Sequence, residues 1–385
     1  MKNFSKIMIS YILKVILFPL RVFRIKSDRI IFSGLTGGGA FEYTGNPKYL
    51  CEYIKENEGY RFRIIWLVSE PKRYQGQCQD IIFLKHYSLR SYYYLMTTKV
   101  IVTNGSYAPW FPFRKSQKVI NTWHGGGAYK KIESDTPDAS WADKKQAVAA
   151  GKNTSLFVSS CQKATELEFR GAFSYEGEVL EVGMPRNDCL VRGEYLASAT
   201  KVREQYNITP SERIVLYAPT YRKCDRDIVL NEEQLLNLLT SGGQTWRLLF
   251  RAHRYATGDT IIGVDGDDYI DVTDYSDMQE LLMAADMVIT DYSSLIWDYS
   301  FLERPCFLYT PDVKEYLSTT GFYVGMEHWP FKNANTMKEL LELIRGYNDN
   351  ENKESIAEHH QFMGNRETGE ACGAITKWIL DNCES

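Results

Sequence analysis

Residues 81–103, IIFLKHYSLRSYYYLMTTKVIVT, decide the fold class of this 385-residue chain. Residues 81–84 and 100–103 are short runs rich in β-branched and aromatic side chains, which favour strands. Residues 89–97, between them, have the pattern of a helix. A strand, a helix and a second strand in this order predict a βαβ unit, and therefore a parallel sheet.

The same alternation continues along the chain in two series. The first series of strand-like runs contains residues 29–33, 62–68, 81–84, 100–103, 119–122 and 156–159, and the second contains residues 214–217, 247–250, 269–272, 287–290 and 306–309. A polar, helix-prone segment, residues 192–210, separates the series. We therefore expect an α/β protein with two Rossmann-like domains, residues 28–195 and 196–385, facing each other across a cleft.

The composition excludes several classes of protein. The chain has 45 Lys and Arg against 49 Asp and Glu, a net charge of −4, and 44% hydrophobic residues. These values exclude a disordered chain and argue against a dedicated nucleic-acid binder. Its 8 cysteines are scattered without a C-x-x-C pair, as is typical of reduced thiols in a cytosolic protein. No P-loop and no EF-hand are present, and the sequence predicts neither a metal nor a cofactor.

Residues 1–27 differ from the rest of the chain because they carry basic side chains and no acidic one. Their apolar runs are too short and too interrupted for a spanning helix, and they lack the small residues of a signal-peptide cleavage site. We expect an amphipathic helix that lies in the interface of an anionic membrane, held in part by Lys6, Lys14, Arg21 and Arg24. The alternative is a helix docked on the surface of the first domain.

Ligands of open α/β sheets bind at the carboxyl ends of the strands, so polar residues just after the predicted strands are candidates for a site. In the first half, NTWHGGG at residues 121–127 places His124 and three glycines directly after a strand. This arrangement suits a general base, although a histidine that only caps its own turn fits equally well. GMPRND at residues 183–188 is either part of the site or a hinge turn.

Three such segments occur in the second half. YAPTYR at residues 217–222 and RAHR at residues 251–254 offer cations that suit phosphate oxygens. TDYSS at residues 290–294 predicts a helix capped by Asp291, with Ser293 and Ser294 in a first turn that attracts anions. Solvated surface arginines and an ordinary capped helix are the alternatives.

Together with the GNP of residues 45–47, these segments resemble the CDP-glycerol glycerophosphotransferase family of teichoic-acid and capsule synthesis. The resemblance covers about residues 28–330. It implies a GT-B fold and a peripheral, monotopic enzyme at the cytoplasmic face of the cell membrane. It also implies CDP-glycerol or CDP-ribitol as donor, a polyprenyl-diphosphate-linked glycan or growing polymer as acceptor, and release of CMP. A homo-oligomer is compatible with it.

The resemblance assigns roles to particular residues. His124 would activate the acceptor hydroxyl, and His253 would act at the donor phosphates. The residues expected to bind the donor are Pro219, Thr220, Arg222, Arg251, His253, Thr290, Asp291, Ser293 and Ser294, and those expected on the acceptor side are Trp123, Gly125, Gly126, Arg186 and Asp188. Two other functions remain open: a GT-B glycosyltransferase that uses a nucleotide sugar, and a non-catalytic, membrane-tethered nucleotide-binding protein.

Overall fold

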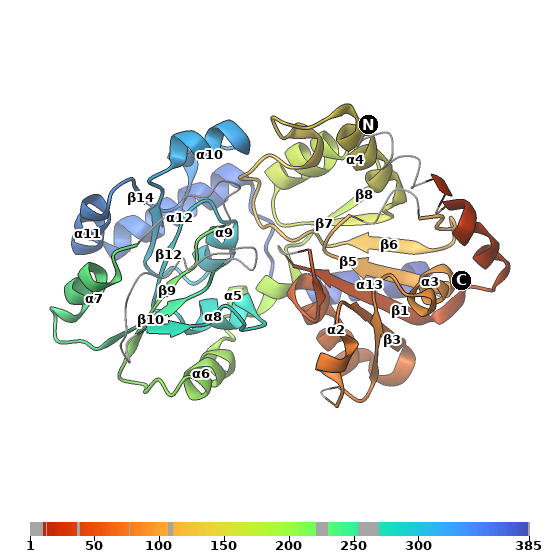
Figure 1. Ribbon diagram of the computed structural model, residues 1–385, viewed down its shortest axis with the longest axis horizontal. Coiled ribbons are helices and arrows are strands. Elements are labelled where there is room, and N and C mark those ends of the chain that lie inside the picture. The colour runs from red at the N-terminus through yellow and green to blue at the C-terminus, as the bar shows by residue number, and fades with distance from the viewer. Residues whose placement is uncertain are drawn as a thin grey trace. The chain divides into compact units, whose positions relative to one another are not determined.

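A computed structural model describes residues 11–12, 14–36, 39–76, 78–106, 111–220, 230–252 and 269–383. The chain divides into two compact units (Figure 1). The first unit comprises Met1–Asp188 together with Asn365–Ser385, and the second comprises Cys189–Gly364. Each unit has its own sheet and its own hydrophobic core.

The first unit is built on a parallel sheet with strand order β4-β3-β1-β5-β6-β7-β8, in which the short β2 pairs antiparallel with β1. Its strands are β1 (Lys26–Leu35), β2 (Phe41–Glu42), β3 (Arg63–Val68), β4 (Ile81–Lys85), β5 (Thr98–Thr103), β6 (Lys118–Asn121), β7 (Leu156–Ser159) and β8 (Glu178–Glu181). Its helices are α2 (Gly45–Glu58), α3 (Leu89–Thr97), α4 (Trp141–Asn153) and α13 (Ala371–Cys383), with a π-helix over Ala164–Ala172. The expected βαβ unit, β4-α3-β5, is confirmed.

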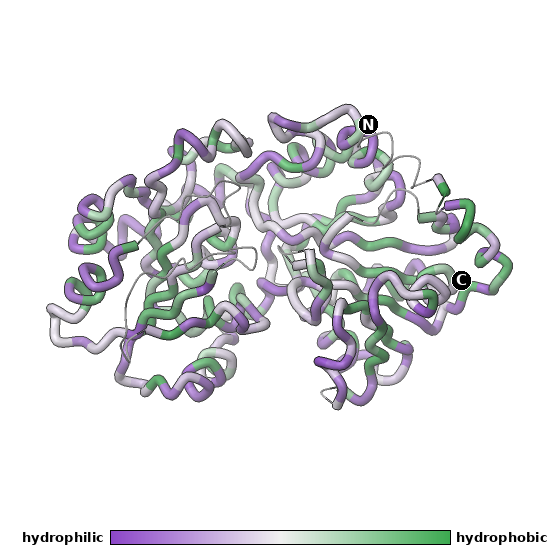
Figure 2. Tube along the Cα trace, in the orientation of Figure 1, coloured by the Kyte–Doolittle hydropathy of each residue, from purple (hydrophilic) through white to green (hydrophobic). Residues whose placement is uncertain are grey.

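Both faces of this sheet are buried, which is why its strands are almost continuously apolar. Successive side chains of β1 point to opposite faces, so Ile30 and Phe32 pack with α2 and α13 while Ile31 packs with α3. The central strands consequently form hydrophobic tracts in both units (Figure 2).

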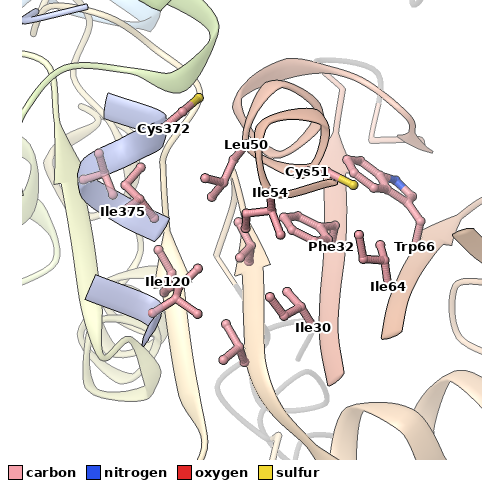
Figure 3. Packing of buried hydrophobic residues seen from close by; sticks show 14 of the residues in the cluster. Ile30, Phe32, Leu50, Cys51, Ile54, Ile64, Trp66, Ile120, Cys372 and Ile375 are labelled. Carbon is pink, nitrogen blue, oxygen red and sulfur yellow. The ribbon is translucent and has the colours of Figure 1, made fainter. Parts of the chain in front are cut away.

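Helix α13 shows that the first unit is formed by two separate stretches of the chain. Ile375 and Ile379 are fully buried in the same cluster as Leu50 of α2 and Ile120 of β6, and Figure 3 shows Cys372 and Ile375 facing this core. The expectation that residues 196–385 form the second domain therefore needs a correction. The last helix completes the first unit because its apolar face covers part of the first sheet.

The N-terminal segment is described only in part, and Lys6 lies outside the described residues. Residues 14–17 are helical and continue into a 3₁₀ turn over Phe18–Val22. Leu17 is buried in the cluster beneath α3, and Leu20 packs against it. Among the described residues, no helix is long and apolar enough to cross a membrane.

The second unit has an entirely parallel sheet in its described strands, with order β11-β10-β9-β12-β13-β14. These strands are β9 (Arg213–Tyr217), β10 (Trp246–Phe250), β11 (Tyr269–Asp271), β12 (Met287–Thr290), β13 (Cys306–Tyr309) and β14 (Asn333–Ala334). The helices are α5 (Asp188–Arg192), α6 (Leu196–Gln205), α7 (Glu232–Thr240), α8 (Met278–Ala284), α9 (Leu295–Ser300), α10 (Val313–Thr319), α11 (Met337–Arg345) and α12 (Asp349–Met363). The expectation of two parallel-sheet, Rossmann-like domains is thus confirmed.

Candidate active site

The first candidate site is the turn that follows β6, where the backbone is held in an unusual conformation. Trp123 has φ 52°, a left-handed value that costs a residue with a Cβ about 1 kcal/mol or more. The Trp123 amide donates to Asn121 Oδ1 (2.9 Å), and its ring is buried against Phe173. The Trp123 side chain therefore anchors the turn in the core, and its place on the acceptor side stays a prediction.

His124 is the next residue of this turn, and part of the residue is accessible to solvent. Its Nδ1 lies 3.0 Å from the carbonyl oxygen of Asn104, and because a carbonyl only accepts, Nδ1 carries the proton. The lone pair is then on Nε2. Desolvation by the surrounding protein lowers the pKa of His124, and the charges of Arg186 and Lys130 lower it further. The ring is therefore neutral at pH 7 and available as a base.

Asn46, at the start of α2, fixes the carbonyl groups on the other side of the same turn. Its Nδ2 donates to the carbonyl oxygens of Thr122 (3.1 Å) and Trp123 (2.9 Å), and its Oδ1 accepts from the Arg186 amide (3.3 Å). Asn46 is completely buried, so these bonds replace water that cannot reach the groups. One side chain thus ties the GNP, TWHG and GMPRND segments together.

The GMPRND turn also contacts His124 directly. Arg186 Nη1 donates to the His124 carbonyl oxygen (2.7 Å), which places a buried guanidinium beside the candidate base. Asp188, whose place on the acceptor side stays a prediction, accepts from the amides of Ala371 (2.9 Å) and Cys372 (2.8 Å) through its two carboxylate oxygens. It therefore caps the start of α13.

The glycines after His124 lie against the next strand. Gly125 is half-buried and Gly126 is buried. Gly127 has φ 65°, a value that favours glycine, and its amide donates to Ser160 Oγ (3.2 Å) just after β7. The glycines thus allow the chain to turn tightly below the histidine.

The second candidate site lies in the second unit, where the ends of β9 and β12 are joined by Asp291. Its carboxylate accepts from the Thr220 amide (3.0 Å to each oxygen) and from Thr220 Oγ1 (2.8 Å). Thr290 Oγ1 donates to the Ala218 carbonyl oxygen (2.7 Å). The APT and TDYSS segments are therefore brought together, as expected for one site.

The expected role of Asp291 as a helix cap is wrong. Helix α9 begins at Leu295 with Ser294 at its N-cap position, and Asp291 bonds to Thr220 instead. Ser293 Oγ accepts from the Leu295 amide (3.3 Å). Both serines are half-buried at the carboxyl end of β12, so they still border the candidate site. The strand-to-helix connection is longer than the sequence suggests because Asp291 is used across the sheet.

The structure describes only some of the remaining residues that were expected to bind the donor. Pro219 is half-buried beside Thr220. Arg251 is half-buried after β10, with Nη1 3.4 Å from Met278 Sδ. Arg222 and His253 lie outside the described residues, as does residue 254 of the RAHR segment. In the described parts of the chain, no group of three or more His, Cys, Asp or Glu side chains is arranged to hold a metal ion.

With both strand-end sites in place, we compared the chain with known proteins. Residues 15–380 match the family model for CDP-glycerol:poly(glycerophosphate) glycerophosphotransferases. The chain belongs to this family. It is therefore a transferase of the CDP-polyol phosphotransferase type, and the resemblance noted in its sequence is confirmed.

Relatives of this glycerophosphotransferase act in teichoic acid synthesis. A teichoic acid poly(glycerol phosphate) polymerase of Bacillus spizizenii is 28% identical over 98% of the chain and 99% of its own length. A teichoic acid ribitol-phosphate primase of the same organism is 29% identical over 74% of each protein. The solved structure of the wall teichoic acid polymerase TagF, 24% identical, has a TM-score of 0.82 and is matched over 100% of the chain and 98% of its own. This last likeness shows the fold.

Three residues that orient the site of this glycerophosphotransferase were not among the predicted site residues. They are Asn46, Asn104 and Glu367; the last accepts from the Met184 amide (2.8 Å) and from Asn187 Nδ2 (3.0 Å). For Asn46 the sequence signal was the Gly-Asn-Pro start of α2. Asn104 follows β5 as other candidates follow their strands, whereas Glu367 is about 180 residues away from its partners in sequence and has no local signature.

Proposed function

We propose that this enzyme transfers glycerol phosphate, or the related ribitol phosphate, from the CDP-polyol to a hydroxyl of a lipid-linked glycan or growing teichoic acid or capsule polymer. Membership of the glycerophosphotransferase family supports the reaction type. Relatives named for glycerol phosphate and for ribitol phosphate support both donors. The observation that carries the proposal is the neutral, oriented His124, because this transfer needs a base for an incoming hydroxyl.

The proposed step begins when Nε2 of His124 accepts the proton of the acceptor hydroxyl. The acceptor oxygen then forms a bond to the β-phosphorus of the CDP-polyol, and the bond from that phosphorus to the bridging oxygen breaks. CMP leaves with this oxygen. The hydrogen bond from Nδ1 to Asn104 stabilises the imidazolium that forms, because its N–H dipole already points at a carbonyl.

We assign the donor to the second unit. Phosphoryl transfer depends mainly on positioning and on neutralising phosphate charge. The half-buried Thr220, Ser293 and Ser294 offer hydroxyl groups at adjoining strand ends, and Arg251 follows the next strand of the sheet. The sequence adds Arg222, and the family resemblance adds His253, as groups that donate hydrogen bonds to the phosphates.

We further propose that the N-terminal segment, residues 14–23, attaches the enzyme to an anionic membrane. Leu17 and Leu20 hold it against the first unit, while Val15, Ile16, Phe18 and Val22 are exposed, Val22 to 83%. Lys14 and Arg24 are exposed beside them and Arg21 is half-buried. Four exposed apolar side chains flanked by cations suit reversible interfacial binding. Docking on the first unit and membrane contact are thus compatible.

The decisive experiment is incubation of the enzyme with CDP-glycerol or CDP-ribitol and a lipid-linked disaccharide. We expect release of CMP and an acceptor that gains the mass of one or more polyol phosphates. Release of a nucleoside diphosphate from a nucleotide sugar would instead indicate a glycosyltransferase. Binding of CDP-polyol without turnover on any acceptor would indicate a non-catalytic protein.

Membrane attachment is tested by reversing three charges. K14E/R21E/R24E should release the enzyme from anionic vesicles and slow reaction on a lipid-linked acceptor, with little change on a short water-soluble one. The matched control is K144E/K145E/K152E on α4, which changes the net charge equally on the same unit. Vesicle binding that survives the first variant at low salt would contradict electrostatic attachment.

A further inference from the structure

A small pocket opens beside the turn that holds Asn104. It lies at the carboxyl end of the first sheet and is closed on one side by α3. Its volume is about 40 Å³, which holds roughly three water-sized groups. The lining residues that matter here are Leu35, His86, Tyr87, Tyr92, Gly105 and Phe111.

His86 is the unusual member of this lining. It is only 8% exposed, and neither ring nitrogen has a hydrogen-bond partner among the described residues. Desolvation lowers the pKa of His86 to about 4, so the ring is neutral at pH 7, with one nitrogen a donor and the other an acceptor. Unpaired buried polar atoms are destabilising, and two hydroxyl groups of a ligand can satisfy both nitrogens, one by accepting from the ring N–H and the other by donating to the ring lone pair.

The orientation of this ring is fixed by its neighbours. Phe41 stacks on one face, with ring centroids 3.6 Å apart and planes 7° from parallel, and the Tyr87 ring meets it edge-on at 4.1 Å. Tyr87 has φ 59°, a strained value for a residue with a Cβ, although its side chain is largely exposed. A strained backbone that holds an exposed aromatic ring beside a pocket is typical of a binding site rather than of a folding requirement.

Asn104 connects the pocket with the candidate base, because it bonds both to a residue that lines the pocket and to His124. Asn104 Oδ1 accepts from the Leu35 amide (2.7 Å), Asn104 Nδ2 donates to the Leu35 carbonyl oxygen (3.0 Å), and the Asn104 carbonyl accepts from His124. Leu35 and the adjacent Gly105 both line the pocket. Among the described residues that line it there is no lysine or arginine, so the pocket suits a neutral group rather than a phosphate.

We infer that this pocket binds the neutral, hydroxylated end of the acceptor, a terminal polyol unit, and so presents the acceptor beside His124. The inference rests on the proposed transfer to a hydroxyl and adds a subsite to it. His86 is thereby a specificity residue: it recognises hydroxyl groups, whereas the donor phosphates are bound by the second unit.

The test is His86→Phe, which keeps an aromatic ring against Phe41 and removes both nitrogens. With a lipid-linked disaccharide that carries one glycerol phosphate unit, we expect the KM for the acceptor to rise about tenfold or more. The kcat at saturation and the affinity for CDP-glycerol should stay within about threefold. His328→Phe, at an exposed histidine of the second unit, is the matched control and should leave all three values unchanged.

A second variant guards against misfolding of the first. Tyr87→Gly relieves the positive φ, so the melting temperature should rise or stay constant while the KM for the acceptor increases. An acceptor KM that stays within twofold in folded His86→Phe, or in Tyr87→Gly should the former not fold, would overturn the inference. An equal loss of CDP-glycerol affinity would do so as well.

Failure of the proposed function is recognised separately, because the wild-type enzyme would then transfer from neither donor. In that case saturation-transfer NMR with free glycerol and with glycerol 3-phosphate tests the pocket alone. Contact of glycerol with the wild-type protein that is lost in His86→Phe supports the subsite. Contact that does not depend on His86, or equal contact of glycerol 3-phosphate, refutes it.

Discussion

The two strand-end sites are held in place in different ways. In the first unit the turn around His124 is oriented by three separate side chains or carbonyls, from Asn46, Asn104 and Arg186. In the second unit the carboxylate of Asp291 accepts from the amide and the hydroxyl of Thr220, and a further bond, from Thr290 to Ala218, joins the ends of β9 and β12. The first site therefore depends on several residues for its orientation, and the second depends mainly on one carboxylate. A base needs several constraints because a displacement of about 1 Å can cost 100-fold in rate.

The largest effect is expected from His124→Ala. General-base catalysis contributes about 10²- to 10⁴-fold, so turnover should fall by a factor in this range. The affinity for CDP-polyol should change by no more than a few-fold, because the donor is assigned to the second unit. Single-turnover rates and calorimetric donor affinity measure the two quantities. An equal loss of turnover and of donor affinity would contradict the assignment of the base to the first unit and of the donor to the second.

Asp291→Ala should have the next largest effect. It removes every hydrogen bond between the carboxylate and Thr220, and bonds to a charged group are worth about 1.5 to 3 kcal/mol each. We expect the KM for the donor to rise about 10- to 100-fold. Asp312→Asn, at a carboxylate that accepts from the Tyr292 hydroxyl (2.9 Å), is a control that keeps an acceptor and should change this KM by less than about threefold.

Asn46→Ala should cost less than Asp291→Ala, since Asn104 and Arg186 still orient His124. We expect kcat to fall by about tenfold and the KM for the donor to stay constant. Asn57→Ala, on the exposed end of the same helix, is the matched control because its amide donates to the Tyr53 carbonyl (2.9 Å) within that helix. If Asn46→Ala lowers activity more than Asp291→Ala does, the first site also depends mainly on one side chain for its orientation.

The smallest expected effect is a shift of the acid limb of the profile of kcat against pH to lower pH. His124 acts in its neutral form, so kcat should fall on the acid side as the ring is protonated. Because desolvation lowers the pKa of His124, this fall should lie below the ordinary value of 6.5. A profile of kcat against pH checks the direction, and an acid limb at or above pH 6.5 would contradict a desolvated base.

The strands of the fold were predictable where burial on both faces leaves a continuous apolar run. Every strand-like run identified in the sequence corresponds to an observed strand. The missed strands, β2, β8 and β14, are short or half-exposed, and β8 and β14 lie at the edges of the sheets, so burial imposes little pattern on them. The sequence did not predict that α13 belongs to the first unit, because the apolar face of a helix does not indicate which of the two sheets it covers.

The candidate site was predictable to the level of segments but less so to the level of individual roles. The strand-end rule located the turns that contain His124, Thr220 and Asp291. The sequence pattern for helix caps then assigned Asp291 wrongly, because a carboxylate that can cap a helix can equally accept hydrogen bonds from the end of a neighbouring strand. The partners Asn46 and Asn104 act through tertiary hydrogen bonds, which leave no periodic or local pattern in a single sequence.

The place of α13 in the first unit also sets an order of events during biosynthesis. The ribosome makes all of the second unit, Cys189–Gly364, before it reaches the helix that covers the face formed by Leu50 and Ile120. At a translation speed of about 5 to 20 residues per second, the roughly 180 intervening residues take about 10 to 40 s. The nascent first unit thus exposes apolar surface throughout this interval, while the second unit is free to fold to completion.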